Sequence, residues 1–311
     1  MTRTTKEIFE KYEIRKTKKQ RAAFREYVKG VAEGAGYACK VEKAGRSAHN
    51  IVVGSPSSAK VVYTAHYDTC AGMLLPNLIT PKCLPIYILY QLLISAILYT
   101  LPFLMISLFP TLIIEKTGSS LGGGLMLFGG YVALFLAAYI IVAGPANKHT
   151  ANDNTSGVTV LIDLMLSLPE EERGKVAFIF FDLEEMGLLG SQNYAKRHKA
   201  EMKNKLLINF DCVSDGKTIL FAVKKGALPY AEKLAEAFKS NDVFTVDIAT
   251  KGVFYPSDQK AFDAGVGVAA LKKTKRGLLY MDKIHTARDT VYQEENIAYL
   301  VDGSIKLAEI I

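Results

Sequence analysis

The chain has 311 residues, of which half are hydrophobic, and a formal net charge of +7. Its four cysteines have no paired spacing, which argues against a disulfide framework. The amino-terminal segment is charged throughout and has no apolar stretch, so a cleaved signal peptide is not expected. We therefore expect the folded part of the chain in a reducing, cytosolic environment.

Positive charge is concentrated in residues 1–25, which hold nine Lys or Arg and three Glu. No aromatic-interleaved or zinc-finger pattern accompanies this charge, so we expect no nucleic acid partner. A solvated helix or attraction to anionic lipid accounts for it. Helical spacing of Ala23, Tyr27 and Val31 predicts a helix over residues 4–35.

Three strands are expected next, at 37–41, 50–53 and 61–65, and His66 follows the last of them. Beyond residue 155, strands are expected at 176–181, 206–210, 218–223, 243–248 and 266–271, and helices at 156–167, 191–198, 230–239, 258–263 and 294–310. This alternation predicts an α/β fold whose mainly parallel sheet is covered by helices on both faces. Ligands bind beyond the carboxyl ends of the strands in such sheets. Four candidate site residues follow expected strands: His66, Glu184, Glu185 and Asp211.

An almost uncharged segment interrupts this alternation. Two apolar runs, 84–114 and 121–143, contain no formal charge, and each is long enough to cross a bilayer as a helix. Pro102 and Pro110 are expected to kink or shorten the first helix. A buried helical pair or a hydrophobic lid over the site is the alternative. Several glycines in the second run allow close helix packing within the chain or with another copy, which leaves a homo-oligomer open.

The position of the insert determines its topology. If His66 and Asp153, which flank it, serve one site, the chain leaves and returns on the same side, as two spans do. Lys82 and Lys148 flank the insert on the domain side, so the positive-inside rule places the catalytic domain in the cytosol. The expected organisation is a hydrolase domain made of residues 1–75 and 148–311, with a transmembrane hairpin at 76–147 whose spans cover about 84–108 and 121–143.

Side chains suited to metal binding occur on both sides of the insert. Zinc accepts imidazole nitrogens and carboxylate oxygens, and a pair of zinc ions needs a shared carboxylate to offset their repulsion. The ligand candidates are His66, Asp153, Glu185, Asp211 and His285. Asp68 is suited to orient His66, and Glu184 to accept a proton from the attacking water. Glu184 and Glu185 lie between two apolar stretches, where a solvated surface is not expected.

The order of motifs along the chain resembles that of the M28 family of zinc peptidases, the aminopeptidase and glutamate carboxypeptidase lineage. These motifs are HYD, NDNTSG, FFDLEEMGLLGS, INFD, YPSDQKAF and HTARDT. The resemblance implies a three-layer α/β/α phosphorylase/hydrolase-like domain with a mainly parallel, mixed sheet. It also implies two Zn²⁺ ions, for which Co²⁺ or Mn²⁺ can substitute. Family members usually have a short loop where this chain has its insert.

The resemblance further implies how five side chains share the two metals. Asp153 corresponds to the bridging carboxylate. His66 and Glu185 are expected to complete the coordination of one metal, and Asp211 and His285 that of the other. No expected ligand is missing, which argues against a degenerate family member.

A mechanism and a substrate class are implied as well. Glu184 corresponds to the general base, Asp68 orients His66, and Asp258 receives no catalytic role. The expected function is a membrane-anchored exopeptidase, an aminopeptidase that hydrolyses peptides through a metal-bridging hydroxide. Its partners are then a peptide or amide substrate and the lipid bilayer. The alternatives are a glutaminyl cyclase-like enzyme with one zinc, an N-acyl amide hydrolase, or a catalytically inactive membrane scaffold.

Overall fold

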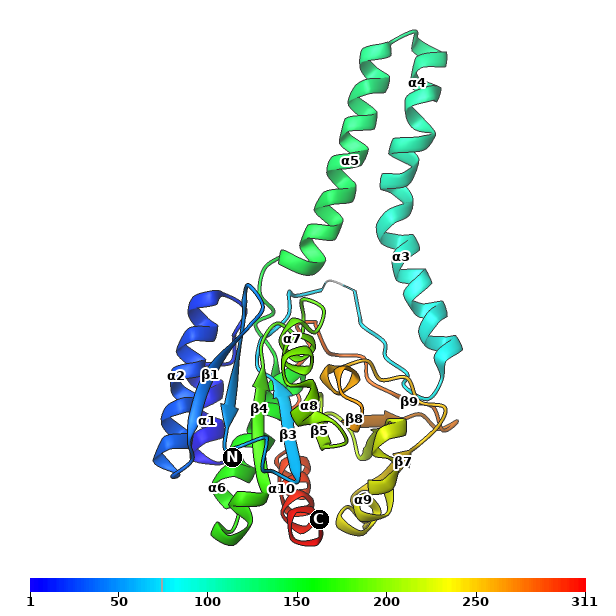
Figure 1. Ribbon diagram of the computed structural model, residues 1–311. Coiled ribbons are helices and arrows are strands. Elements are labelled where there is room, and N and C mark those ends of the chain that lie inside the picture. Colours follow the sequence, from blue (N-terminus) through cyan, green and yellow to red (C-terminus); the bar gives the residue numbers. More distant parts are fainter. Residues whose placement is uncertain (74) are drawn as a thin grey trace.

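A mixed sheet with helices on both faces forms the body of the protein (Figure 1). The computed structural model describes residues 1–73 and 75–311. Within these residues the strand order is β1 (Cys39–Ala44), β2 (Ala48–Val53), β4 (Val176–Phe181), β3 (Val61–His66), β5 (Leu206–Phe210), β8 (Gly265–Lys273), β6 (Thr218–Val223) and β7 (Thr245–Ala249), and β9 (Leu279–Tyr280) pairs with β8. Strands β4, β3, β5 and β8 are parallel, whereas β2 joins β4 and β6 joins β8 in antiparallel fashion.

The central strands are buried along their whole length and mostly apolar because both of their faces are covered. Every residue of β3, β4, β5 and β6 is buried. Val61 and Tyr63 belong to the larger apolar cluster on one face, and Val62 belongs to the smaller cluster on the other. The expected strands at 176–181, 206–210 and 218–223 and the α/β class are confirmed.

The helices form the two outer layers. On the face with the larger cluster lie α1 (Arg3–Lys11), α2 (Lys18–Gly34), α6 (Gly157–Ser167), α9 (Ala231–Ala237) and α10 (Glu294–Ile310). The opposite face is covered by α7 (Leu189–Arg197), α8 (Lys199–Met202) and the 3-10 helix Asp258–Ala261. Two further 3-10 helices, Glu170–Lys175 and Lys225–Tyr230, lead into β4 and α9. The resulting three layers confirm the expected α/β/α arrangement.

The prediction of a single helix over residues 4–35 is wrong, because the segment forms two helices, α1 and α2. Thr17 caps the amino-terminal end of α2 with a capping box, in which its hydroxyl accepts from the Gln20 N–H and the Gln20 side chain accepts from the Thr17 N–H. Arg15 in the connecting turn is fully buried, and Arg21 pairs with the buried Asp182 at 2.8 Å. Part of the positive charge in this segment is therefore structural.

The almost uncharged insert forms a hairpin that projects from the body, on the side away from both chain termini (Figure 1). It consists of α3 (Leu84–Ser107), α4 (Phe109–Thr117) and α5 (Ser120–Ala143), with Pro110 in the first turn of α4. Two helical stretches, Leu84–Thr117 and Ser120–Ile140, are long and apolar enough to be candidate membrane spans. Leu89 and Phe135 are 70% and 71% exposed, so the pair is not buried in the body.

Glycines on α5 allow close packing inside the hairpin. A Cβ added to Gly123 would lie 2.7 Å from the Ile114 side chain, and one added to Gly130 would lie 2.8 Å from Ile106. These distances are shorter than Cβ contacts allow, so glycine is required where α5 meets α3 and α4. The expected close approach of two helices is confirmed within the chain.

Candidate metal centre

The expected site residues meet at the carboxyl ends of neighbouring parallel strands. His66 ends β3, Glu184 and Glu185 follow β4, and Asp211 follows β5. Asp153 lies in the irregular turn before α6, where the chain returns from the hairpin. Three overlapping groups have ligand atoms within 4.8 Å of one another: His66–Asp153–Asp211, His66–Glu184–Glu185 and Cys70–Glu185–His285. None of His49, His149 and His198 belongs to these groups within the described residues.

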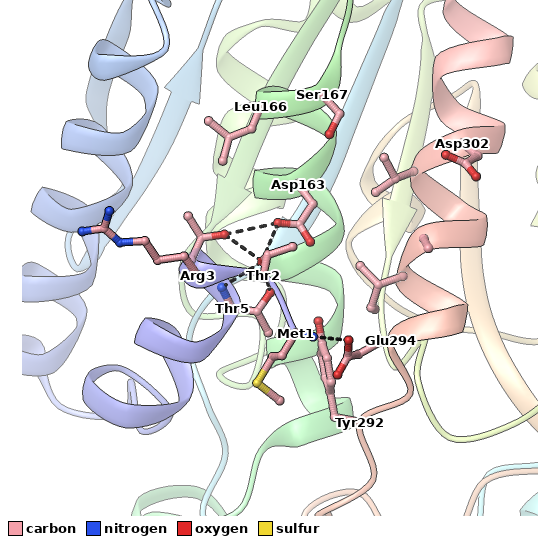
Figure 2. A pocket seen from close by; sticks show the side chains of 14 residues that line it. Met1, Thr2, Arg3, Thr5, Asp163, Leu166, Ser167, Tyr292, Glu294 and Asp302 are labelled. Atoms are coloured by element: carbon pink, nitrogen blue, oxygen red, sulfur yellow. Dashed lines mark hydrogen bonds and ion pairs between the residues drawn. The ribbon is translucent and has the colours of Figure 1, made fainter.

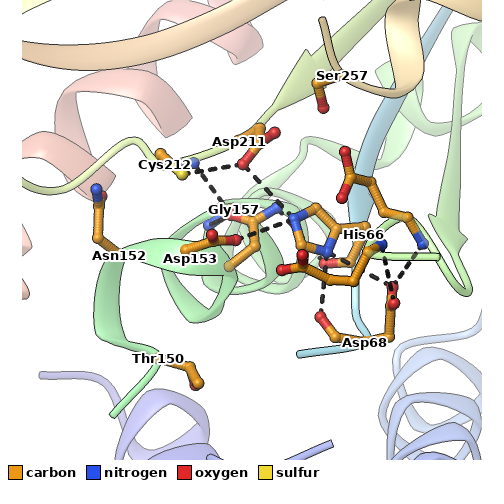
Figure 3. Close-up of polar contacts among 12 residues, drawn as sticks. His66, Asp68, Thr150, Asn152, Asp153, Gly157, Asp211, Cys212 and Ser257 are labelled. Carbon is orange, nitrogen blue, oxygen red and sulfur yellow. Dashed lines mark hydrogen bonds and ion pairs between the residues drawn. The ribbon is translucent and has the colours of Figure 1, made fainter. Parts of the chain in front are cut away.

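Asp153 lies at the centre of the cluster and uses both of its carboxylate oxygens. Its Oδ1 is 3.2 Å from Nε2 of His66, and its Oδ2 is 2.9 Å from Nε2 of His285 (Figure 3 shows the His66 side). Asp153 as a whole is 3% exposed. One buried carboxylate therefore faces two separate imidazoles, one from each of its oxygens.

The remaining contacts favour a different sharing of ligands from the expected one. His66 Nε2 is 3.6 Å from Asp211 Oδ1, and His285 Nε2 is 3.3 Å from Glu185 Oε2. β3 lies between β4 and β5, so strand adjacency alone brings His66 near the residues that follow both neighbours, and the ion-pair distances distinguish them. These distances favour His66 with Asp211 and His285 with Glu185, whereas Glu185 also lies within 4.8 Å of His66, so the expected pairing of His66 with Glu185 stays a prediction.

Asp68 contacts the tandem glutamates as well as His66. Its carboxylate accepts hydrogen bonds from the backbone N–H groups of Glu184 (3.0 Å) and Glu185 (3.2 Å). His66 Nδ1 lies 3.1 Å from the Asp68 carbonyl oxygen and 3.6 Å from its carboxylate (Figure 3). Asp68 is 2% exposed, so these bonds form away from bulk water. It therefore orients the Glu184–Glu185 turn, a contact that the sequence did not indicate.

Two supporting residues escaped the sequence reasoning. Asp289 is buried, and its carboxylate accepts from the backbone N–H groups of Asn152 and Asp153, both at 3.0 Å. Asn154 donates to the Phe210 carbonyl at 2.9 Å and so ties the Asp153 turn to the end of β5. The sequence signal that could have found Asp289 is its place in the motif HTARDT, four residues after the ligand candidate His285. Both side chains fix the backbone around Asp153.

Burial and charge shift the pKa values of the cluster. Burial alone would lower the pKa of His66, but hydrogen bonds to Asp153 and Asp211 outweigh it and hold that pKa well above its usual value. Burial raises the pKa of Glu184, and Glu185 and Asp211 raise it further, although His66 opposes them. Burial and the nearby Asp153 carboxylate raise the pKa of Asp289 to about 7.

The donor set fits metal cations. Carboxylates outnumber imidazoles in this buried or half-buried cluster, and such an excess of negative charge is unfavourable unless cations offset it. Glu185 Oε1 is buried and has no hydrogen-bond partner among the described residues. Nitrogen and carboxylate donors at this separation are the ligands that zinc takes.

A cavity of about 110 Å³ opens onto the cluster. His66, Glu184 and His285 are among its lining residues, together with Asp153, Asp211 and Cys212. The remaining lining residues are largely apolar: Ile79, Tyr87, Phe254, Tyr255, Pro256 and Ile284. A cavity of about 640 Å³ lies elsewhere, between the amino-terminal residues, α6 and α10 (Figure 2). None of the expected site residues lines it, and Asp163 there accepts hydrogen bonds from Thr2 and Thr4. The smaller cavity is therefore the candidate substrate site.

The fold and this cluster define an α/β metallohydrolase. The family model for peptidase family M28 matches residues 138–301, so the chain belongs to that family and is a zinc metallopeptidase. No curated protein matches the sequence.

Solved structures of three bacterial proteins share the fold at low sequence identity. The LapA aminopeptidase of Legionella pneumophila is 15% identical (TM-score 0.55, covering 98% of this chain and 69% of that one). A glutaminyl cyclase of Bacteroides thetaiotaomicron is 15% identical (TM-score 0.58, covering 98% of this chain and 94% of that one). A Zn-dependent exopeptidase of Parabacteroides distasonis is 14% identical (TM-score 0.52, covering 98% of this chain and 97% of that one). At this identity the likeness concerns the fold, which is found with more than one activity.

Proposed function

We propose that the protein is a membrane-anchored exopeptidase that uses two zinc ions, most simply an aminopeptidase. The arrangement of Asp153 carries this proposal, because its two oxygens face His66 and His285 separately. In the proposed site, His66, Asp211 and Asp153 hold one metal, and His285, Glu185 and Asp153 hold the other. Co²⁺ or Mn²⁺ can occupy the same donors.

The chain's own residues account for proton transfer and positioning. Zinc bound there supplies a Lewis acid for the scissile carbonyl and lowers the pKa of a water molecule. Glu184 lines the cavity and accepts a proton from the attacking water. As the C–N bond breaks, the Glu184 carboxyl returns that proton to the leaving amine. Asp68 holds the Glu184 backbone through its N–H and so keeps the base in position.

The size of the cavity supports cleavage next to a chain end. About 110 Å³ is well below the roughly 300–1,000 Å³ typical of ligand pockets. It suits one side chain rather than an extended peptide. The apolar wall, with Phe254 and Ile284, favours an apolar terminal residue.

The anchoring proposal rests on the hairpin. Its apolar side chains are exposed over two lengths that match a bilayer, and burial in lipid would remove this surface from water. Two spans return the chain to one side, as a single metal centre requires. Lys82 and Lys148 favour a cytosolic catalytic domain, although Lys82 also pairs with Asp247 in the folded domain. Residues 76–147 thus form the proposed insert.

A second candidate activity follows from the origin of the cavity wall. Tyr87 belongs to the first turn of α3, and its ring lies 5.7 Å from that of Phe254. The end of the hairpin that joins the catalytic domain therefore lines the site. A substrate that lies partly in the bilayer could reach the site there, which favours amphiphilic substrates such as N-acyl amides. A glutaminyl cyclase-like reaction is the other alternative on this scaffold, and a single metal ion per chain would support it.

The deciding experiment is metal analysis of the purified full-length protein, with a panel of aminoacyl, glutaminyl and N-acyl substrates, with and without lipid. We expect two zinc ions per chain and release of apolar amino-terminal residues. Glu184→Gln is expected to keep both metals and lose about 10²- to 10⁴-fold in kcat. Wild-type turnover in that variant would remove the proposed base, and a preparation that binds no divalent metal would favour the inactive scaffold.

Membrane insertion is tested separately. The protein is expected to stay in the membrane after an alkaline wash. In sealed vesicles, protease should digest the catalytic domain only where the cytosolic face is outside. Release by the wash would refute anchoring, and digestion from the opposite face would refute the proposed orientation.

A further inference from the structure

Cys70 lies beside the proposed metal centre without a role in the mechanism above. Its Sγ, a carboxylate oxygen of Glu185 and a ring nitrogen of His285 all lie within 4.8 Å of one another. Cys70 is 4% exposed, and no disulfide involves it. A thiol, a carboxylate and an imidazole at this separation form a ligand set suited to zinc.

Backbone hydrogen bonds hold the segment that carries Cys70 in this place. The Asn147 N–H donates to the Cys70 carbonyl at 3.1 Å, and the Gly72 N–H donates to the Pro145 carbonyl at 2.9 Å. The Met73 N–H donates to the His285 carbonyl at 2.6 Å. Cys70 is therefore fixed against both the loop of His285 and the chain that returns from the hairpin.

A neighbouring donor atom is also left without a partner. Glu185 Oε1 is buried and accepts no hydrogen bond from the described residues, while Oε2 faces His285 at 3.3 Å. A buried carboxylate oxygen of this kind is unfavourable unless it meets a cation or a donor. A metal between Glu185, His285 and Cys70 would meet this need.

The two halves of the proposed centre, one around His66 and one around His285, differ in whether a cysteine lies among the donors. The group around His66, Asp153 and Asp211 contains no cysteine among the described residues. The nearby Cys212 donates its S–H to Asp211 Oδ1 at 3.1 Å and so contacts a ligand candidate rather than joining the group. Among the described residues, the half with His285 therefore has a thiol donor that the half with His66 lacks.

We propose that Cys70 is a thiolate ligand of the metal held by Asp153, Glu185 and His285, which closes that position with four protein donors. The other position keeps an open side toward the cavity. This inference rests on the proposed function, because it assumes the same metal centre. On binding, the S–H bond breaks, a sulfur–metal bond forms, and the proton passes to solvent. Closed four-ligand zinc sites are structural and open ones are catalytic, so the two metals have unequal tasks and affinities.

Cobalt spectroscopy tests the thiolate directly. Metal-free full-length protein in detergent micelles is titrated with Co²⁺, and absorption is followed in the near ultraviolet, where thiolate-to-cobalt charge transfer appears. We expect this band in the wild-type protein, its loss in Cys70→Ser and its retention in Cys212→Ser. Co²⁺ bound without the band, or a band that persists in Cys70→Ser, overturns the proposal and leaves the metal centre intact. Failure to bind Co²⁺ at all overturns both proposals.

Zinc retention provides a second measurement, and its main readout comes from the wild-type protein. During titration with a chelator, the wild-type protein should lose one zinc well before the other, and the retained zinc should protect one thiol from alkylation at Cys70. Cys70→Ser should weaken the retained site by about 10- to 100-fold. Equal loss of both metals from the wild-type protein, or free alkylation of Cys70 in the loaded protein, refutes the proposal.

Discussion

Asp68→Ala is the substitution that most directly tests how the tandem glutamates are positioned. It removes the acceptor of two backbone hydrogen bonds, from Glu184 at 3.0 Å and Glu185 at 3.2 Å, in a place that is 2% exposed. A buried donor left without a partner costs about 1–3 kcal/mol, so the two together cost roughly 2–6 kcal/mol. In the metal-free protein, the loss of the Asp68 charge also relieves repulsion among the clustered carboxylates. The lower part of this range is therefore expected for the metal-free protein. Asp68→Asn keeps one acceptor oxygen and is expected to lose about 1–3 kcal/mol.

The assay compares stability and zinc affinity in the same detergent. Thermal unfolding with and without zinc gives the first quantity, and competition with a chelator gives the second. We expect Asp68→Ala to weaken zinc binding about 10- to 100-fold, because ligand orientation is lost while every ligand remains. Asp242→Ala, at an exposed position, is the matched control. Equal stability and equal zinc affinity in the two variants would refute the argument that Asp68 supports the site.

Two further predictions concern parts of the fold away from the metal centre. Burial raises the pKa of Glu42, but hydrogen bonds with His198 and Lys40 lower it more, so its pKa lies below the usual value. Its contribution to stability is therefore present above the unfolded-state pKa and is lost as the pH falls through the folded-state pKa. Glu42→Gln should lower the free energy of unfolding by about 1 kcal/mol at pH 7, and the difference should vanish in acid; a pH-independent difference in urea titrations would contradict this. A Cβ at Gly303 would lie 2.3 Å from the buried Phe238 ring, whereas one at Gly30 meets nothing within 4 Å. Gly303→Ala is expected to destabilise by about 1–3 kcal/mol and Gly30→Ala to stabilise by about 0.5–1 kcal/mol, and urea midpoints that move in the same direction would be the contrary result.

Sequence reasoning located the ligand candidates because strand ends are local features. A buried apolar run such as 176–181 is visible in the sequence, and the polar residues that follow it must lie at the sheet edge. It did not find the roles of Asp289 and Cys70, because their partners are far away in the chain. Asp289 bonds to Asn152 and Asp153, and Cys70 lies near Glu185 and His285. Such contacts depend on how loops fold over the sheet.

The sharing of ligands between the two proposed metal positions could not be predicted for the same reason. The order along the chain places His66 first and His285 last, and neither position says which neighbour each one meets. Strand order does not decide it either, because β3 lies between β4 and β5 and His66 is therefore close to the residues that follow both strands. The loop that carries His285 decides it, because this loop brings His285 Nε2 to Glu185, while His66 Nε2 lies near Asp211. The break between α1 and α2, by contrast, could have been predicted, because the capping-box residues Thr17 and Gln20 are visible in the sequence.

By itself the sequence determined the α/β class, the family motifs, the apolar insert and the set of candidate metal-binding side chains. These follow from local composition and periodicity, which act over a few residues. The tertiary structure alone decided which side chains share a neighbour, that α3 contributes Tyr87 to the cavity, and that Cys70 faces one half of the centre. Those features arise when segments separated by tens to hundreds of residues pack together, and no local pattern encodes that packing.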